Sequence, residues 1–416
     1  MRIELKLISF FLVLSVLCTN CGPAGFQSSV NSIYKFNPIP GTIGGNIISL
    51  KVGCGYKNML CASVQLCSPS APATCVTLNN LLLDTGSTGL RVFASKITGL
   101  GTLHTQTDAF GNSVGACAIY GDGSYHWGSL QLANLVLGTE SAILSTPIQV
   151  IDYTFGDSGA TCRASSGASV IPDAAATGYD GILGIKFFQH DCGSSCVTNP
   201  GTSNPLYIAC NGVNCGYLSW PVSSQIRNPI AALAGDNNGY IIDMLPALSI
   251  STSATVAGSL IFGIGTQANN SPDLNAVTKL SVEPTYGSIK ATFNGATVAA
   301  IVDSGSNANF FQYSGMATCA TFTSFFCPVV SPTTFPISLV ANSGPIRVDT
   351  SITVDNGDTL YAPANTNIAF SNLAGPIPVG LTGFFDFGLS FFFGRRIYYG
   401  LESSPTSLGD GPYLGL

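Results

Sequence analysis

The sequence predicts an all-β protein built as two related lobes, and three observations favour this fold class. The chain has 416 residues with 47 glycines, and charged residues make up only 9 % of it against 46 % hydrophobic residues. Short apolar and β-branched runs, separated by Gly, Asn and Asp turns, continue from about Gly45 to the end. An acidic motif that ends an apolar strand also occurs twice, once in each half of the chain.

Composition excludes several classes of protein. Disordered chains combine low hydrophobicity with high charge, and this chain has the reverse. Nucleic-acid-binding proteins carry a basic surface, whereas 15 Lys and Arg stand here against 21 Asp and Glu, for a net charge of −6. We therefore expect no nucleic-acid partner. The mean hydropathy of +0.37 is high, but only one long apolar run exists, so we assign the rest to a buried core.

That apolar run, Leu7 to Cys18, opens the chain. It is too short to cross a bilayer, which takes about 20 residues, and it predicts a secretory signal peptide over residues 1–20. The residues around it resemble a bacterial lipoprotein processing site in which Cys21 is lipidated. The alternative is an ordinary cleaved signal and free secretion. Residues 21–44 are rich in Ser, Asn, Pro and Gly and predict a tether.

We therefore expect an exported protein. It would be either a lipoprotein of the bacterial cell envelope, at the outer membrane or surface, or a secreted protein. Its contact with the membrane would be the N-terminal lipid anchor.

The cysteines agree with export. Apart from Cys18 and Cys21 there are twelve, an even number, which predicts six disulfides in an oxidising compartment. The spacing leaves their connectivity open, although three close pairs could each close a short loop: Cys192/Cys196, Cys210/Cys215 and Cys319/Cys327. The alternative is a metal site formed by His190 with Cys192 and Cys196, which an oxidising compartment disfavours. We expect no metal and no cofactor.

The clearest strand patterns cover Asn46–Val52, Leu130–Leu137, Ala142–Ile151, Ser259–Ile264, Thr297–Val302 and Arg395–Tyr399. Helical periodicity is scarce, and Pro229–Ala234 is the best short candidate. The aromatic run Phe391–Phe393 is expected to be core on a buried strand. The three histidines, His104, His126 and His190, are expected at the surface.

The repeated motif carries the candidate chemistry. Residues 79–83 form an apolar strand that ends at Asp84, followed by Thr-Gly-Ser, and residues 299–302 form another that ends at Asp303, followed by Ser-Gly-Ser. Glycine permits a tight turn and a close approach there, and the hydroxyls can bond the carboxylate and the backbone. A single copy is ordinary turn chemistry. Two copies on matched strands, 219 residues apart, could bring two carboxylates together at a pseudo-twofold axis.

Two carboxylates in contact cannot both ionise easily, so they share a proton and one acts as base while the other acts as acid. Such a pair can activate water for attack on an amide carbonyl and protonate the leaving nitrogen. No metal or covalent intermediate is needed.

At this point the chain resembles the pepsin-like aspartic peptidases, and the resemblance extends from about Gly45 onward. Further matches, in the expected order, are a flap hairpin (Ile119–Ser124), the element that supports the first loop (Tyr179–Gly184), the first hairpin of the second lobe (Gly258–Gly263) and the second supporting element (Asp386–Tyr399). Residues 84–91 and 388–395 look more closely like an uncharacterised bacterial lipoprotein family with pepsin-type motifs.

The resemblance implies a bilobal fold with the active-site cleft between its lobes. The N-terminal lobe would cover residues 45–240, with a Cys-rich insertion at 186–228, and the C-terminal lobe residues 241–416. The resemblance implies that Asp84 and Asp303 form the dyad. Thr85 and Ser304 would lock the two loops together, Gly86 and Gly305 would be the turn glycines, and Ser87 and Ser306 would bond the outer carboxylate oxygens. The flap would contain Tyr120, Gly121, Asp122 and Gly123.

The resemblance implies an aspartic endopeptidase, expected to be monomeric, that hydrolyses internal bonds of an extended polypeptide with an acidic optimum. The alternative is a catalytically silent surface lipoprotein of the same fold that binds peptide or protein. Asp84 and Asp303 would then be structural turn acids. Where pepsins place a Trp that bonds the flap tyrosine, this chain has Arg91, which either pairs with an acid or faces the substrate.

Overall fold

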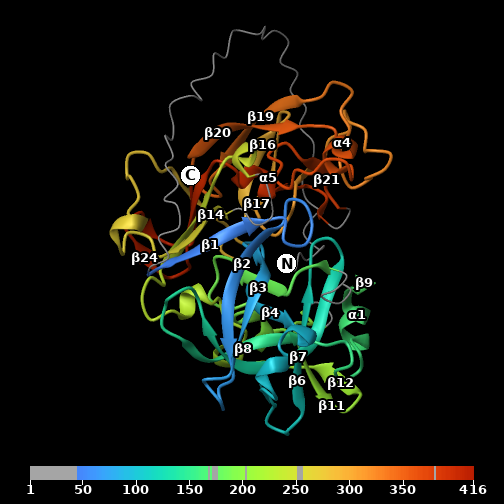
Figure 1. Ribbon diagram of the computed structural model, residues 1–416, viewed down its shortest axis with the longest axis vertical. Helices are drawn as coiled ribbons and strands as arrows, with labels where there is room; N and C mark the ends of the chain where they lie inside the picture. The colour runs from blue at the N-terminus through green and yellow to red at the C-terminus, as the bar shows by residue number, and fades with distance from the viewer. Residues whose placement is uncertain (1–44, 167–168, 171–176, 202–203, 251–255, 379–380) are drawn as a thin grey trace.

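The computed structural model describes residues 45–166, 169–170, 177–201, 204–250, 256–378 and 381–416 (Figure 1). The predicted signal peptide, the predicted lipidation residue Cys21 and all of the predicted tether lie outside these residues. Within them, no helix is both long enough and apolar enough to cross a membrane. Strands dominate the described chain, which confirms the all-β class.

The described strands form a sheet of 17, a sheet of seven and a two-stranded ribbon. The large sheet contains β1 (Ile47–Val52), β2 (Leu60–Cys67), β3 (Cys75–Asp84), β4 (Thr88–Phe93), β5 (His104–Thr105), β6 (Ser113–Ile119), β7 (Ser124–Val136), β8 (Ile143–Ile151), β9 (Ser169–Val170), β10 (Gly181–Ile185), β11 (Tyr207–Asn211), β12 (Asn214–Tyr217), β13 (Gly239–Met244), β14 (Val256–Phe262), β15 (Lys279–Ser281), β23 (Arg396–Gly400) and β26 (Tyr413–Gly415).

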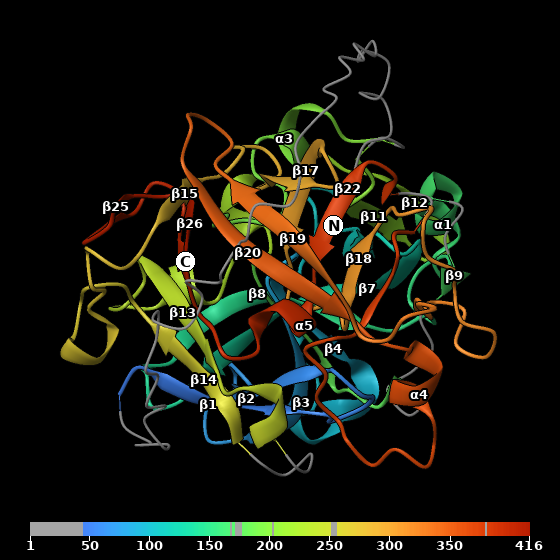
Figure 2. The same ribbon diagram turned by 90° about the horizontal axis from the view of Figure 1, so that it is seen from above.

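The seven-stranded sheet contains β16 (Ile289–Phe293), β17 (Ala296–Val302), β18 (Asn309–Phe311), β19 (Thr333–Val340), β20 (Arg347–Val354), β21 (Ala374–Pro376) and β22 (Phe384–Phe387), and the ribbon contains β24 (Pro405–Thr406) and β25 (Gly409–Asp410). In the view from above, the long β19–β20 hairpin crosses the molecule (Figure 2). The short α-helices are α1 (Ala160–Ser166), α3 (Ser195–Thr198), α4 (Gly357–Tyr361) and α5 (Leu389–Phe392).

The two strands that carry the repeated motif, β3 and β17, are surrounded by the same order of parallel and antiparallel strand pairings. Strand β3 pairs parallel with β10, β10 pairs antiparallel with β4, and β4 pairs parallel with β8. In the second half of the chain, β17 pairs parallel with β22, β22 pairs antiparallel with β18, and β18 pairs parallel with β21. This repeated order of pairings shows two related β lobes, as the doubled motif predicts.

A run of strands from both ends of the chain joins the lobes. The order β1–β14–β13–β23–β26–β15 is antiparallel throughout. In Figure 1, β1 and β14 lie between the group around β3, β4 and β8 and the group around β16, β17, β19 and β20. Strand β13 spans residue 240, so the exact division into lobes at that residue stays a prediction.

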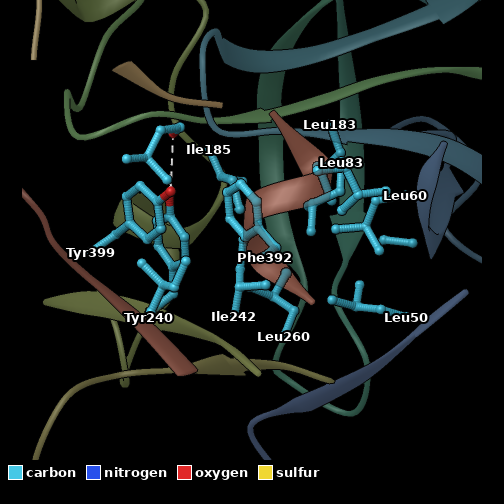
Figure 3. Packing of buried hydrophobic residues seen from close by; sticks show 14 of the residues in the cluster. Leu50, Leu60, Leu83, Leu183, Ile185, Tyr240, Ile242, Leu260, Phe392 and Tyr399 are labelled. Atoms are coloured by element: carbon cyan, nitrogen blue, oxygen red, sulfur yellow. Dashed lines mark hydrogen bonds between the residues drawn. The ribbon is translucent and has the colours of Figure 1, made fainter. Parts of the chain in front are cut away.

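One apolar core runs beneath both motif strands (Figure 3). It brings Leu83 of β3 and Leu183 of β10 together with Phe392 of α5, and the rings of Tyr240 and Tyr399 stack within it at 4.8 Å and 7°. Phe391–Phe393 are core, as predicted, but the strand prediction for them is wrong. The chain turns at once after Gly388 because the Leu389 amide donates to the Ser306 carbonyl at 2.7 Å, and a helical turn follows.

Six disulfides confirm the cysteine prediction and indicate an oxidising compartment. They include the three close pairs, and the others join Cys54 to Cys61, Cys67 to Cys75 and Cys117 to Cys162. The bond between Cys192 and Cys196 uses both sulfurs of the alternative metal site. The helix predicted at Pro229–Ala234 is a 3-10 turn over Ile230–Ala232.

Candidate active site

The repeated motif places two carboxyl groups at equivalent strand ends. Asp84 is the last residue of β3, and Asp303 directly follows β17. The three residues before each of them are buried apolar residues, so packing drives both strands inward until the acid is reached. Asp84 is only 6 % exposed, and Asp303 is partly buried beside it.

Thr85 and Ser304 fasten the two loops together with crossed hydrogen bonds. The Thr85 hydroxyl donates to the Val302 carbonyl at 2.9 Å and accepts from the Ser304 amide at 3.0 Å. The Ser304 hydroxyl donates to the Leu83 carbonyl at 2.7 Å and accepts from the Thr85 amide at 3.2 Å. Each loop therefore orients the backbone of the other.

This fastening brings the two carboxyl groups into contact. A Cβ on Gly86 would stand 2.8 Å from the carboxyl atoms of Asp303, and a Cβ on Gly305 would stand 2.7 Å from Oδ1 of Asp84. Only glycine permits so close an approach. Burial, the charge of Asp84 and a hydrogen bond between the two side chains raise the pKa of Asp303 to about 8. The pair therefore retains one shared proton at neutral pH.

Each carboxyl group is also oriented from its own loop. The Gly86 amide donates to Oδ1 of Asp84 at 2.7 Å, and the Gly305 amide donates to Oδ1 of Asp303 at 2.9 Å. The Ser87 hydroxyl donates to Oδ2 of Asp84, and that of Ser306 lies 3.2 Å from Oδ2 of Asp303. In each acid, Oδ1 thus accepts a main-chain amide, and the outer oxygen, Oδ2, faces a serine hydroxyl.

The predicted flap is the turn between β6 and β7. The Tyr120 amide donates to the Ser124 carbonyl at 2.9 Å, and the Gly123 amide returns a bond to the Tyr120 carbonyl at 3.1 Å. Asp122 accepts from the amide and hydroxyl of Ser124, which gives it a turn-forming role. At the tip, a Cβ on Gly121 would meet the Leu381 side chain of the second lobe at 2.7 Å, so the flap is closed across the cleft.

His126 is the hydrogen-bond partner of the flap tyrosine, and its predicted surface position is wrong. The Tyr120 hydroxyl lies 2.8 Å from Nδ1 of His126, a fully buried residue of β7. Its ring packs edge-on against Phe93 and Tyr120. Burial, with the charge of Arg91, lowers the pKa of His126 to about 3, so the ring is neutral. The uncharged stretch between the flap and Trp127 is the only signal in the sequence for this burial.

Arg91 forms a buried ion pair, one of the two alternatives that the sequence leaves open. Its guanidinium lies 3.3 Å from Asp191, with both side chains 3 % exposed, and it donates to Gln149 at 2.7 Å. Asp191 also accepts from the Tyr207 hydroxyl at 2.7 Å. Burial raises the pKa of Asp191 to about 6, and the Arg91 charge opposes this rise. The pair fixes the insertion against β4.

A cavity of about 330 Å³ lies between this pair, the first motif loop and the flap. Gly86, Ser87 and Tyr120 line one side of it, and Lys186 and Tyr286 line another. Burial lowers the pKa of Lys186 to about 8, while Asp303 and Asp84 oppose that fall. The cavity is therefore a polar space that opens directly beside the dyad.

The family model described as a protein of unknown function (DUF3443) matches residues 42–415. The chain belongs to this family. No curated protein matches the DUF3443 chain. Solved structures similar to it include basic 7S globulin from soybean, at 12 % identity and a TM-score of 0.47 with 89 % of this chain and 94 % of that one covered. Another is conglutin gamma from lupine seeds, at 11 % identity and a TM-score of 0.42 with 89 % and 93 % covered.

The paired motif loops on equivalent strands of two β lobes confirm the predicted pepsin-like bilobal fold of this DUF3443 chain. The peptidase activity, the bacterial source and the lipid anchor stay predictions.

Asp386 of β22 is a third acid at the site, and the sequence places it only within a supporting element. It is 3 % exposed, and its Oδ2 lies 2.6 Å from the hydroxyl of Ser306. Burial raises its pKa well above the ordinary value, the charges of Asp303 and Asp84 add to the rise, and the hydrogen bond with Ser306 opposes it. In the sequence, Asp386 is a single acid within an apolar element that ends at a glycine. That pattern does not indicate that Asp386 lies next to the dyad.

Proposed function

We propose that this protein is an aspartic endopeptidase that hydrolyses internal peptide bonds of an extended polypeptide. The observation that carries the proposal is the contact between Asp84 and Asp303, which hold one proton between them at neutral pH. A shared proton gives the pair one acid and one base at the same time, which hydrolysis of an amide needs.

The raised pKa of Asp303 supports the roles proposed for the two acids. Asp84 acts as the carboxylate and removes a proton from a water molecule held between the two groups, as that water attacks the carbonyl carbon. Asp303 gives its proton to the carbonyl oxygen, so a neutral tetrahedral intermediate forms. The proton taken by Asp84 then passes to the amide nitrogen and the C–N bond breaks, while the hydroxyl proton returns to Asp303. The crossed bonds of Thr85 and Ser304 keep both acids in place throughout.

The flap supports an extended substrate. It is a β-hairpin whose tip reaches the opposite lobe at Leu381, so a strand of substrate beneath it would be enclosed. Main-chain bonds along such a strand give affinity without demanding a particular sequence. The polar cavity beside Ser87 would then receive one substrate side chain.

The test is hydrolysis of unfolded casein by the full-length chain, produced in an oxidising compartment, from acid to alkaline pH. We expect an acidic optimum and inhibition by a pepstatin-type peptide. Asp84→Asn and Asp303→Asn should each lower the rate by about 10²- to 10⁴-fold. The control is Asp349→Asn, which alters an exposed acid of β20 and should leave the rate unchanged. Unchanged cleavage in either dyad variant contradicts the proposal.

The closed flap also favours the second candidate, a silent module that retains bound peptide. This candidate requires a folded chain that cleaves nothing at any pH but binds an unfolded polypeptide with equal affinity in the wild type and in Asp303→Asn. Binding that accompanies cleavage in the wild type supports the enzyme.

We also propose that the exported chain is anchored through a lipid on Cys21. The six disulfides support export, and the cysteine follows the predicted signal peptide. Labelling with a radioactive or clickable fatty acid in a bacterial host should mark the wild type and Cys18→Ser, and Cys21→Ser should lose the label. A label that persists in Cys21→Ser contradicts the anchor.

A further inference from the structure

The hydroxyl of Ser306 lies between two carboxyl groups. Its oxygen is 3.2 Å from Oδ2 of Asp303 and 2.6 Å from Oδ2 of Asp386. A serine hydroxyl has one hydrogen to donate and two lone pairs that accept. It therefore cannot donate to both acids, and a hydrogen bond on each side requires one carboxyl group to carry a proton directed at the Ser306 oxygen.

The surroundings of Asp386 identify it as the protonated member. Among the residues that the structure describes, its Oδ1 has no hydrogen-bond partner and no cation pairs with it. The residues paired beside it are Ile301 on β17 and Phe310 on β18, both uncharged. The titratable groups that face it are the acids Asp303 and Asp84. A buried carboxylate with an unpartnered oxygen and only acids nearby is strongly disfavoured.

We propose that Asp386 is a third acid that is protonated in the working form of the site, and that it positions Ser306. Its Oδ2–H donates to the Ser306 oxygen, and the Ser306 hydroxyl then donates to Oδ2 of Asp303. The order of donation is Asp386, Ser306, Asp303. The effect on hydrolysis rests on the proposed peptidase function, whereas the protonation of Asp386 does not.

Loss of the Asp386 proton reverses this order. Ser306 then turns its hydrogen toward the new carboxylate at 2.6 Å, so the outer oxygen of Asp303 loses its donor. A negative charge also appears beside the dyad and holds the shared proton more tightly. Both changes disturb the acid that must release its proton to the substrate, so hydrolysis should decline as Asp386 ionises.

The first experiment is independent of activity. A protonated, buried Asp386 has a folded pKa above its unfolded pKa, so its contribution to stability is complete at low pH and is lost as the pH rises through the folded pKa. Asp386→Asn cannot ionise, so its free energy of unfolding should fall less than that of the wild type toward alkaline pH. Infrared difference spectra at neutral pH should also lose one carboxylic-acid carbonyl band in Asp386→Asn, and none in the control Asp349→Asn. Parallel stability curves with no lost band overturn the proposal.

The second experiment measures hydrolysis. Asp386→Asn keeps a donor toward Ser306 but cannot ionise, so its rate should begin to decline at a higher pH than that of the wild type. Ser306→Ala removes the donor to Asp303, and Asp386→Leu removes the donor that orients Ser306, so each should lower kcat by about 10- to 100-fold with little change in KM. An Asp386→Asn profile that matches the wild type on the alkaline side overturns the proposal. If the wild type cleaves nothing, the peptidase function fails, and the stability and infrared results still decide the protonation of Asp386.

Discussion

Thr85 and Ser304 make equivalent hydrogen bonds across the boundary between the lobes. Each hydroxyl donates to a carbonyl of the opposite motif strand and accepts the main-chain amide of the other residue. The geometry of each acid is therefore set partly by the other lobe, and this reciprocity can be tested through stability.

Thr85→Ala removes one hydroxyl that makes two of these bonds and leaves the Ser304 amide without its acceptor. We expect a loss of about 1–3 kcal/mol in the free energy of unfolding, measured with urea. Thr85→Ser restores the hydroxyl and should recover most of that loss. Equal stability of the Ala and Ser variants would show that the crossed bonds contribute little.

The pKa of Asp303 predicts a pH dependence of stability. Its folded pKa of about 8 exceeds the ordinary carboxyl value near 3.8, so the native state binds the proton more tightly than the unfolded state. Stability from this group is complete below about pH 4 and is lost as the pH rises through about 8. Asp303→Asn removes this titration and should be stabilised relative to the wild type as the pH increases. The measurement is chemical unfolding across that range, and a constant difference between the two proteins contradicts the pKa assignment.

The bond between Tyr120 and His126 predicts a specific effect on hydrolysis. His126→Phe keeps a ring but removes the hydrogen-bond partner, so we expect kcat/KM for a peptide substrate to fall by about 3- to 10-fold. His126→Gln can accept the same bond and should lose less. Because the pKa of His126 is about 3, the wild-type profile should show no histidine inflection near neutrality. A smaller loss for His126→Phe than for His126→Gln would argue against this role.

The Arg91–Asp191 pair is expected to matter for folding. Arg91→Met leaves Asp191 buried without its cation, and such changes cost about 3–5 kcal/mol. The matched control is the exposed pair Arg347–Asp349, whose side chains are about 60 % exposed. Arg347→Met should cost no more than about 1 kcal/mol. Both variants are compared by denaturant unfolding. Similar losses in their free energy of unfolding would mean that burial of the Arg91–Asp191 pair adds nothing to stability.

The sequence predicts the large features of this molecule because they depend on local patterns. The apolar runs before Asp84 and Asp303 predict both the strands and the motif, and the short cysteine spacings indicate three pairs that could bond and do so in the structure. Phe391 and Phe392, expected on a strand, are instead helical because a long-range bond from Leu389 to Ser306 turns the chain. A pattern of apolar residues does not contain that bond.

The residues that the sequence missed acquire their roles only through tertiary contacts. Histidine is a polar residue type, which favours a surface position. The pairing of β6 with β7 and the ring of Phe93 nevertheless bury His126. Asp386 lies 80 residues from Ser306, and only the alignment of β22 beside β17 brings the two together. A single polar residue in an apolar strand gives no indication of which polar group it will meet.

The crossed bonds beneath the dyad have a mechanical consequence. Because four hydrogen bonds join the loops at the base of the cleft, pulling the lobes directly apart loads all four at once, and the base resists separation. At the top of the cleft, by contrast, the flap glycine Gly121 faces the apolar side chain of Leu381. We therefore expect that lifting the flap would leave the base of the cleft intact and the spacing of the two acids unchanged.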